Sequence, residues 1–152
     1  MTGKLLLGAL VVLFMAAAPP LKEAKSDSEK LQGTWQLSSV EMNKQPIPLD
    51  DLKSGKTVLV ATLTVKGESY IFTLGEDRLE LTFKMDQTKT PKTMNMLIVA
   101  GPEKGKTYHA IYKLEDDTFT ICRKFDPDEE RPTVFGTTPD SGLMLIVWKR
   151  VK

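Results

Sequence analysis

The stretch Leu79-Glu80-Leu81-Thr82-Phe83-Lys84-Met85 decides the fold class, because apolar and polar residues alternate along all of it. Successive side chains of a β-strand point to opposite faces, so the stretch places four apolar side chains on one face and polar ones on the other. It is the clearest strand pattern in the chain. The sequence therefore predicts a half-buried β-strand at 79–85.

Similar runs lie on both sides of this stretch and are separated by turn residues such as Lys66-Gly67 and Glu115-Asp116-Asp117. They predict seven further strands, at 33–42, 57–66, 69–74, 93–99, 107–114, 118–124 and 143–151. Ser26 and Glu29 form a capping box that predicts a short helix at 27–32, and 49–53 resembles another helical turn. No segment offers the long helix that a parallel crossover needs. We therefore expect an all-β, antiparallel fold with a short N-terminal helical turn.

Eight short antiparallel strands leave two exposed sheet edges unless the sheet closes on itself. The sequence thus predicts an eight-stranded up-and-down barrel, with a two-sheet sandwich as the alternative. An eight-stranded barrel is just wide enough to be filled by its own side chains or to hold one small ligand, and the sequence leaves both open. The side chains expected to face inward are Trp35, Leu37, Leu59, Leu63, Val65, Tyr70, Phe72, Leu79, Leu81, Phe83, Tyr108, Tyr112, Phe119 and Ile121.

The N-terminal residues have the pattern of an export signal. Lys4 precedes an apolar run from Leu5 to Met15, and three alanines follow it at 16–18. We interpret 1–18 as a signal peptide, 19–28 as a polar leader and 29–152 as the barrel domain. The apolar run is shorter than the roughly 20 residues of a membrane-spanning helix, although an uncleaved anchor remains the alternative. The expected location is secreted or periplasmic, without stable membrane insertion after cleavage.

Charge and composition exclude several classes of function. The chain has 21 Lys and Arg against 20 Asp and Glu, so no strong field would attract nucleic acid. One cysteine permits no internal disulfide, and one histidine leaves few metal sites or His-dependent mechanisms. We therefore expect no nucleic-acid partner, no metal, no cofactor and no enzymatic activity.

Two apparent catalytic motifs have simpler explanations. Gly101 and Gly105 precede Lys106-Thr107 like a phosphate-binding loop, but they are one residue too close, and a strand pattern follows where that loop needs a helix. His109 and Cys122 fall on neighbouring strands of one predicted hairpin, but at best diagonally. We expect a hairpin loop in the first case and a packed cysteine in the second.

Gly33-Thr34-Trp35, which opens the first strand after the helical turn, resembles the first sequence motif of the lipocalins. That resemblance implies that Trp35 plugs one barrel end and that Arg150 covers it. Together with further motifs the chain is similar, over about 29–150, to an uncharacterised exported lipocalin-like domain family of planctomycete bacteria. Neither the second lipocalin motif nor a cysteine pair is present, and the resemblance implies no activity. The motifs are Pro91-Lys92-Thr93, Gly101-Pro102-x-Lys104-Gly105-Lys106-Thr107, Ile111-Tyr112, Asp117-Thr118, Ile121-Cys122, Arg131-Pro132-x-x-Phe135 and Ser141-Gly142.

The candidate function follows from the inward-facing aromatic residues. We expect non-enzymatic binding of a small apolar or amphipathic ligand, with a barrel lining of Tyr70, Phe72, Phe83, Tyr108, Tyr112 and Arg123. Arg123 lies near a barrel mouth, where it either reaches solvent or a carboxylate, or anchors an anionic ligand head. In the 125–142 loop, Arg131 and Phe135 are expected to close one barrel end. The alternative function is a protein-binding module, such as a secreted protease inhibitor or an envelope-interaction domain.

Overall fold

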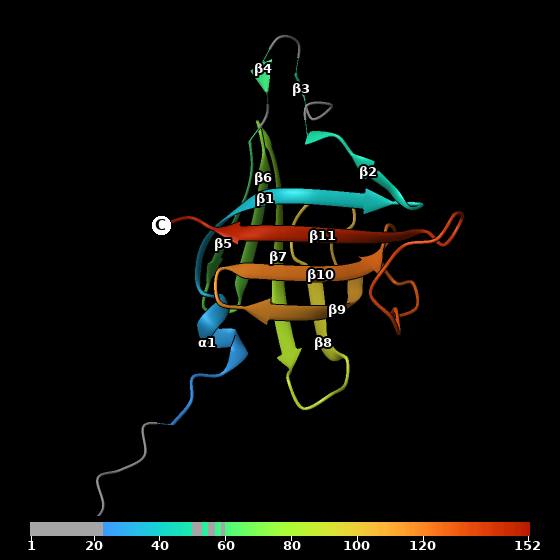
Figure 1. Ribbon diagram of the computed structural model, residues 1–152. Coiled ribbons are helices and arrows are strands. Elements are labelled where there is room, and N and C mark those ends of the chain that lie inside the picture. The colour runs from blue at the N-terminus through green and yellow to red at the C-terminus, as the bar shows by residue number, and fades with distance from the viewer. Residues whose placement is uncertain (1–22, 50–52, 55–56, 59) are drawn as a thin grey trace, which may run out of the picture.

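The computed structural model describes residues 23–49, 53–54, 57–58 and 60–152, and the predicted signal peptide lies outside them. One short helix precedes a series of strands (Figure 1). The elements are α1 (Asp27–Leu31), β1 (Gly33–Met42), β2 (Gln45–Ile47), β3 (Lys53–Ser54), β4 (Thr57–Val58), β5 (Ala61–Lys66), β6 (Ser69–Leu74), β7 (Asp77–Asp86), β8 (Lys92–Ile98), β9 (Thr107–Glu115), β10 (Thr118–Lys124) and β11 (Leu143–Arg150).

The strands close into an antiparallel barrel. From β5 to β11 each strand pairs with the next, and β1 pairs with β5 on one side and with β11 on the other. The closing register places Trp35 opposite Arg150. The predicted lipocalin-like barrel of eight strands is thus confirmed, and the sandwich alternative is wrong. Closure leaves neither β1 nor β11 as a free sheet edge.

The two halves of β1 have different partners. Gly33–Gln36 pair with β5, whereas Val40–Met42 pair with β2, which lies beside β1 outside the eight-stranded ring. A register irregularity between Leu37 and Ser39 separates the halves on the β11 side. Such bulges bend a strand locally. β1 can therefore follow the barrel wall at one end and meet β2 at the other.

The strand predictions agree closely with the structure except between 43 and 66, where the short strands β2 and β3 were not predicted. The expected strand 57–66 is divided into β4 and β5. The helical turn expected at 49–53 lies largely outside the described residues, and Lys53 itself belongs to β3. The N-terminal helix forms as predicted: Ser26 Oγ accepts from the backbone N–H of Glu29, and a Glu29 carboxylate oxygen accepts from the backbone N–H of Ser26.

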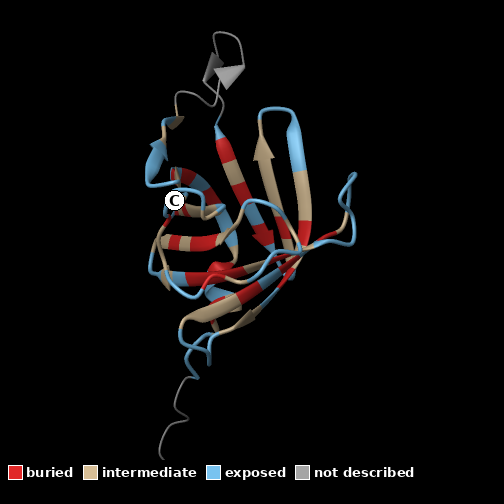
Figure 2. Cartoon of the chain, turned by 90° about the vertical axis from the view of Figure 1, so that its right-hand side faces the viewer, coloured by how far each residue is buried: buried red, intermediate tan, exposed pale blue. Residues whose placement is uncertain are grey.

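The core lies inside the barrel, where buried positions alternate with exposed ones along the strands (Figure 2). The residues predicted to face inward are buried, except that Phe72 and Leu79 are half-buried and Leu59 lies outside the described residues. Further buried core residues are Leu31, Val40, Ala61, Met94, Met96, Ile98, Ala110, Ile146 and Trp148.

The loop between β10 and β11 crosses the outer wall of the barrel, and its residues 131–137 are called the strap below. Arg131 Nη1 donates to the backbone carbonyls of Met94 in β8 and Ala110 in β9. At the other end of the strap the Thr137 hydroxyl donates to the Glu41 carboxylate on β1. This corrects the expectation that Arg131 and Phe135 close a barrel end: Phe135 lies on the outer face, where Lys113 Nζ is 4.5 Å from its ring centroid.

Candidate ligand-binding site

Trp35 plugs the barrel end next to α1. Its side chain is fully buried, its Nε1 donates to the carbonyl of Leu31 at 2.9 Å, and its ring packs against Phe119. The Arg150 guanidinium lies over the indole, with Cζ 4.1 Å from the ring centroid, and donates to the carbonyls of Gln32 and Lys30. This is the arrangement that the lipocalin resemblance implied. Gly33 has φ +118°, and a Cβ there would lie 3.4 Å from Arg150 Nη1, so the position favours glycine.

Asp27 fastens α1 to the plugged end. Its carboxylate is buried and accepts from Lys92 Nζ at 2.6 Å and from the Tyr112 hydroxyl at 2.9 Å. Burial alone would raise the pKa of the Asp27 carboxyl, but the hydrogen bonds from Lys92 and Tyr112 outweigh it and hold that pKa below its usual range. Asp27, which belongs to the predicted polar leader 19–28, is thus buried against the barrel.

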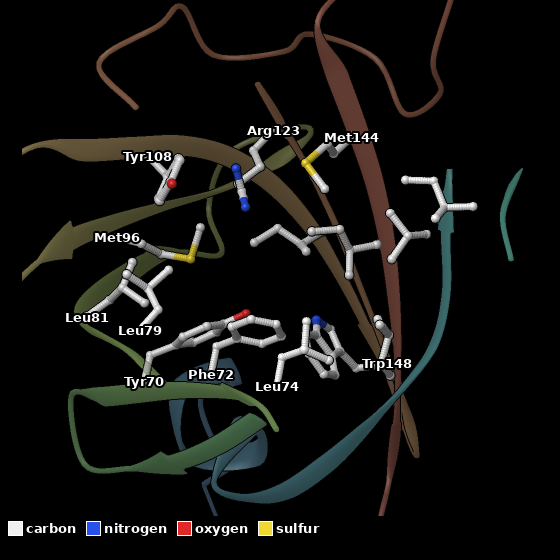
Figure 3. Close-up of a pocket in the computed structure, with 15 residues that line it drawn as sticks. Tyr70, Phe72, Leu74, Leu79, Leu81, Met96, Tyr108, Arg123, Met144 and Trp148 are labelled. Carbon is white, nitrogen blue, oxygen red and sulfur yellow. The ribbon is translucent and has the colours of Figure 1, made fainter. Parts of the chain in front are cut away.

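The barrel is hollow beyond the plug. A cavity of about 230 Å³ lies at the end of the barrel away from α1, and its wall is almost entirely apolar (Figure 3). Phe72 and Trp148 form one side of it with their rings 5.9 Å apart. The lining residues are Leu37, Val40, Ile47, Tyr70, Phe72, Leu74, Leu79, Leu81, Met96, Tyr108, Ile121, Arg123, Met144, Ile146 and Trp148. Their apolar side chains suit an apolar or amphipathic guest.

Arg123 is the one charged residue that the described part of the chain contributes to the wall of this cavity. Its guanidinium carbon lies 4.0 Å from the centroid of the Tyr108 ring, a cation–π contact. Its Nη1 donates to the backbone carbonyls of Lys124 at 2.8 Å and Phe125 at 3.1 Å. Burial lowers the pKa of Arg123, but an arginine remains a cation in proteins. The cavity thus contains a positive charge fixed at one end.

A second polar group lies in the cavity wall away from Arg123. Trp148 Nε1 is buried and has no hydrogen-bond partner among the described residues, although it lies near the Tyr70 hydroxyl (Figure 3). Burial raises the pKa of Tyr70 far above its ordinary value, so its hydroxyl stays protonated at neutral pH. This part of the wall therefore offers neutral polar groups, whereas Arg123 offers charge.

Four of the six predicted lining residues meet in the cavity: Tyr70, Phe72, Tyr108 and Arg123. Phe83 and Tyr112 face inward but do not line it, which corrects the prediction for both. Phe83 packs edge-on against Tyr70, with the ring centroids 6.3 Å apart, and fills space. Tyr112 belongs to the plugged end through Asp27 and Phe119.

Sequence reasoning missed several lining residues, of which Trp148 on β11 is the largest. The run Leu143-Met144-Leu145-Ile146-Val147-Trp148 is apolar throughout, so alternation could not show which face points inward. The place of β11 as the closing strand gives a further signal, because residues of this strand that pair with inward-facing residues of β10 must also face inward.

His109 and Cys122 do not form a catalytic pair. Cys122 pairs with Ile111, so His109 is diagonal to it, and both side chains point away from the cavity. The Cys122 thiol is buried under the strap, 3.8 Å from the Val134 carbonyl oxygen, and burial raises its pKa. His109 Nδ1 is instead 3.2 Å from the Asn95 side-chain oxygen.

The described residues contain no group of three or more His, Cys, Asp or Glu side chains placed to hold a metal ion. Among the same residues no helix is long and apolar enough to cross a membrane. Comparisons with protein-family models, with curated proteins and with solved structures return no match. The structure thus assigns the protein to a class, the closed lipocalin-like barrels with an internal cavity.

Proposed function

We propose that this protein is a non-enzymatic carrier or receptor that binds one small, largely apolar molecule inside its barrel. The observation that carries the proposal is the cavity of about 230 Å³ with an apolar wall in a barrel plugged at the other end. A barrel that served only as a rigid scaffold would gain stability by filling this space, because unfilled apolar cavities destabilise proteins.

The size of the cavity restricts the guest. A volume of about 230 Å³ corresponds to roughly eight molecules of liquid water, since each occupies about 30 Å³. Water is disfavoured there, because a buried water needs several polar partners and most of the wall is apolar. A guest with a short hydrocarbon chain or a single ring matches both the volume and the lining.

Two further parts of the proposal rest on the sequence. The apolar run at 5–15 followed by small residues supports export to a secreted or periplasmic location. A binding role is supported by the polar side chains that the described residues place in the cavity wall, since these are mainly Arg123, Tyr70 and Tyr108 and include no Ser, Cys, His, Asp or Glu. Burial raises the pKa of Tyr70, so its hydroxyl keeps its proton at neutral pH, and arginine cannot lose its proton.

Native mass spectrometry tests the proposal. Residues 19–152 would be exported and purified from the source organism, and the native mass compared with the denatured mass. We expect a discrete additional mass that is lost on denaturation. Leu79→Phe, which inserts a ring into the cavity, should carry less of it, whereas Leu97→Phe on the exposed outer wall should carry as much as the wild type.

A bare mass in the wild type, together with no change in thermal stability when small apolar compounds are added, would contradict ligand binding. That result would favour the alternative function, recognition of a protein partner. Deleting the leader residues 19–25 would test that role, because an inhibitory arm should lose its partner while the barrel stays folded.

A further inference from the structure

We infer that the guest is a compact carboxylic acid that binds with its carboxylate at Arg123 and its apolar chain in the cavity. This inference rests on the proposed function and specifies the ligand class. It is carried by the position of a cation in a wall to which the described residues contribute no other charge, and by the N–H groups that this cation does not use for the loop carbonyls.

Among the described residues, two of the four arginines pair with an acid, whereas Arg123 and Arg131 donate to backbone carbonyls, and only Arg123 of these two lines the cavity. Arg78 forms an ion pair with Glu80, and Arg150 forms one with Asp117. Arg131 instead spans two strands by donating to their carbonyls. Arg123 belongs to no ion pair among the described residues, although it borders an apolar cavity. Arg123 is half-buried, so part of its charge is withdrawn from water without a counter-charge, which is unfavourable.

The unused donors of Arg123 have the geometry of a carboxylate site. Both of its hydrogen bonds to the loop carbonyls come from Nη1, so the edge formed by Nε and Nη2 has no backbone or carboxylate acceptor among the described residues, although the Tyr108 side chain lies close to the guanidinium. That edge presents two parallel N–H groups, which match the two oxygens of a carboxylate. The bonds to the loop and the contact with Tyr108 hold the guanidinium in place, so little order must be gained on binding.

The rest of the wall specifies the chain attached to the carboxylate. Met96 and Met144 lie beside Arg123 (Figure 3), and their flexible thioethers adapt to apolar guests of varied shape. Beyond them the cavity is lined by aliphatic and aromatic side chains. Its volume favours a medium-length chain over the long chain of a membrane fatty acid. Chain length therefore separates a small free acid from a lipid-derived one.

Isothermal titration calorimetry with defined probes tests this inference. Residues 19–152 would be stripped of bound molecules and titrated with butyrate, octanoate, hexadecanoate, octan-1-ol and octyltrimethylammonium. We expect octanoate to bind at least tenfold more tightly than octan-1-ol and more tightly than either other acid. The cationic probe should not bind, because it would meet the charge of Arg123. Tighter binding of hexadecanoate would assign the site to lipid-derived acids and overturn the compact-guest inference.

Variants separate this inference from the proposed function. Arg123→Gln should bind octanoate and octan-1-ol equally, and Arg123→Lys should recover only part of the preference, because it keeps the charge without the paired donors. Arg78→Gln, a surface control, should behave as the wild type. Circular dichroism would confirm that each variant folds.

The outcomes are distinct. Equal binding of octanoate and octan-1-ol by the wild type would overturn the carboxylate inference and leave a ligand-binding cavity. Undiminished octanoate preference in Arg123→Gln would also overturn it. Failure of every probe to bind the wild type would overturn the proposed function together with the inference.

Discussion

Each end of the barrel has an arginine stacked on an aromatic ring, but one arginine covers a filled core and the other borders a cavity. At the plugged end Arg150 lies 4.1 Å from the Trp35 ring, and at the cavity end Arg123 lies 4.0 Å from the Tyr108 ring. Both arginines also donate to two backbone carbonyls. Arg150 has an acidic partner in Asp117 and covers a fully buried tryptophan, whereas Arg123 has no acidic partner among the described residues and faces open space.

This difference shows how one small barrel can combine stability with room for a ligand. At the plugged end α1, the Asp27 carboxylate and the Trp35 indole meet and use their hydrogen-bonding groups on one another and on the barrel. The cavity end leaves side-chain surface and hydrogen-bond donors unused. Substitutions at the plugged end should therefore affect folding, and matched substitutions at the cavity end should affect binding.

The largest effect is expected for Trp35→Ala at the plugged end. Removing a fully buried aromatic side chain costs about 3–5 kcal/mol of unfolding free energy. Urea unfolding followed by circular dichroism measures it. A loss below about 1 kcal/mol would contradict the role of Trp35 as a plug.

Asp27→Asn should have the next largest effect and should depend on pH. At pH 7 the variant should lose about 1–3 kcal/mol, because Lys92 and Tyr112 lose a charged acceptor. The folded-state pKa of Asp27 is lowered, so its contribution is present above the unfolded-state value near 4 and is lost as the pH falls through the folded-state value.

The difference between wild type and Asp27→Asn should accordingly shrink below about pH 4. Urea unfolding at pH 7, 4 and 2.5 measures this, with Asp126→Asn in the exposed loop as the control. A difference that stayed constant over this range would show that the Asp27 charge contributes nothing to stability.

The two stacked arginines provide the most direct test of the comparison. Arg150→Gln should cost about 1–2 kcal/mol, because it removes a cation–π contact and two hydrogen bonds over the plug. Arg123→Gln should change the unfolding free energy by less than about 1 kcal/mol, since it also removes an unpaired charge from an apolar wall. Thermal denaturation of both variants without ligand measures the contrast, and equal losses would contradict it.

The smallest effect is expected from adding one methylene group at each end. Val40→Ile extends into the cavity and should stabilise the protein by up to about 0.8 kcal/mol. Val65→Ile enters the filled region beside Gly33 and should destabilise it by about 1 kcal/mol through overpacking. Calorimetric melting temperatures measure both. Stabilisation by both variants would show that the plugged end is no better filled than the cavity end.

The strands and most of the core could be predicted from the sequence, because alternation fixes both the strand and its inward face. The pattern from Leu79 to Met85 is the clearest case. Where both faces are apolar the pattern carries no such information: Met94 and Met96 face inward, but Leu97 and Val99 beside them left the orientation of β8 undecided. The lining contributed by β11 was missed for the same reason.

The candidate site was predictable only in part, because it depends on contacts between distant segments. The parity of Phe119 and Ile121 correctly placed Arg123 at the cavity. Whether the barrel is hollow depends on how large side chains share its interior, and periodicity does not describe that. The role of Asp27 was concealed by its position in a capping-box segment, and the course of the strap depends on backbone carbonyls that no residue pattern reveals.

Closure of the barrel has a kinetic consequence. From β5 to β11 every pairing joins neighbours in the chain, so these hairpins can form by local search, whereas the seam between β1 and β11 brings together Trp35 and Arg150 from opposite ends of the domain. Such a contact carries the largest loop-closure entropy and is favoured late in folding. Because the seam forms after the transition state for folding, weakening it should accelerate unfolding while barely changing the folding rate. The lifetime of the closed barrel would then depend on a seam that begins at the plug, with Trp35 and Arg150, and continues into the cavity wall, with Val40 and Ile146.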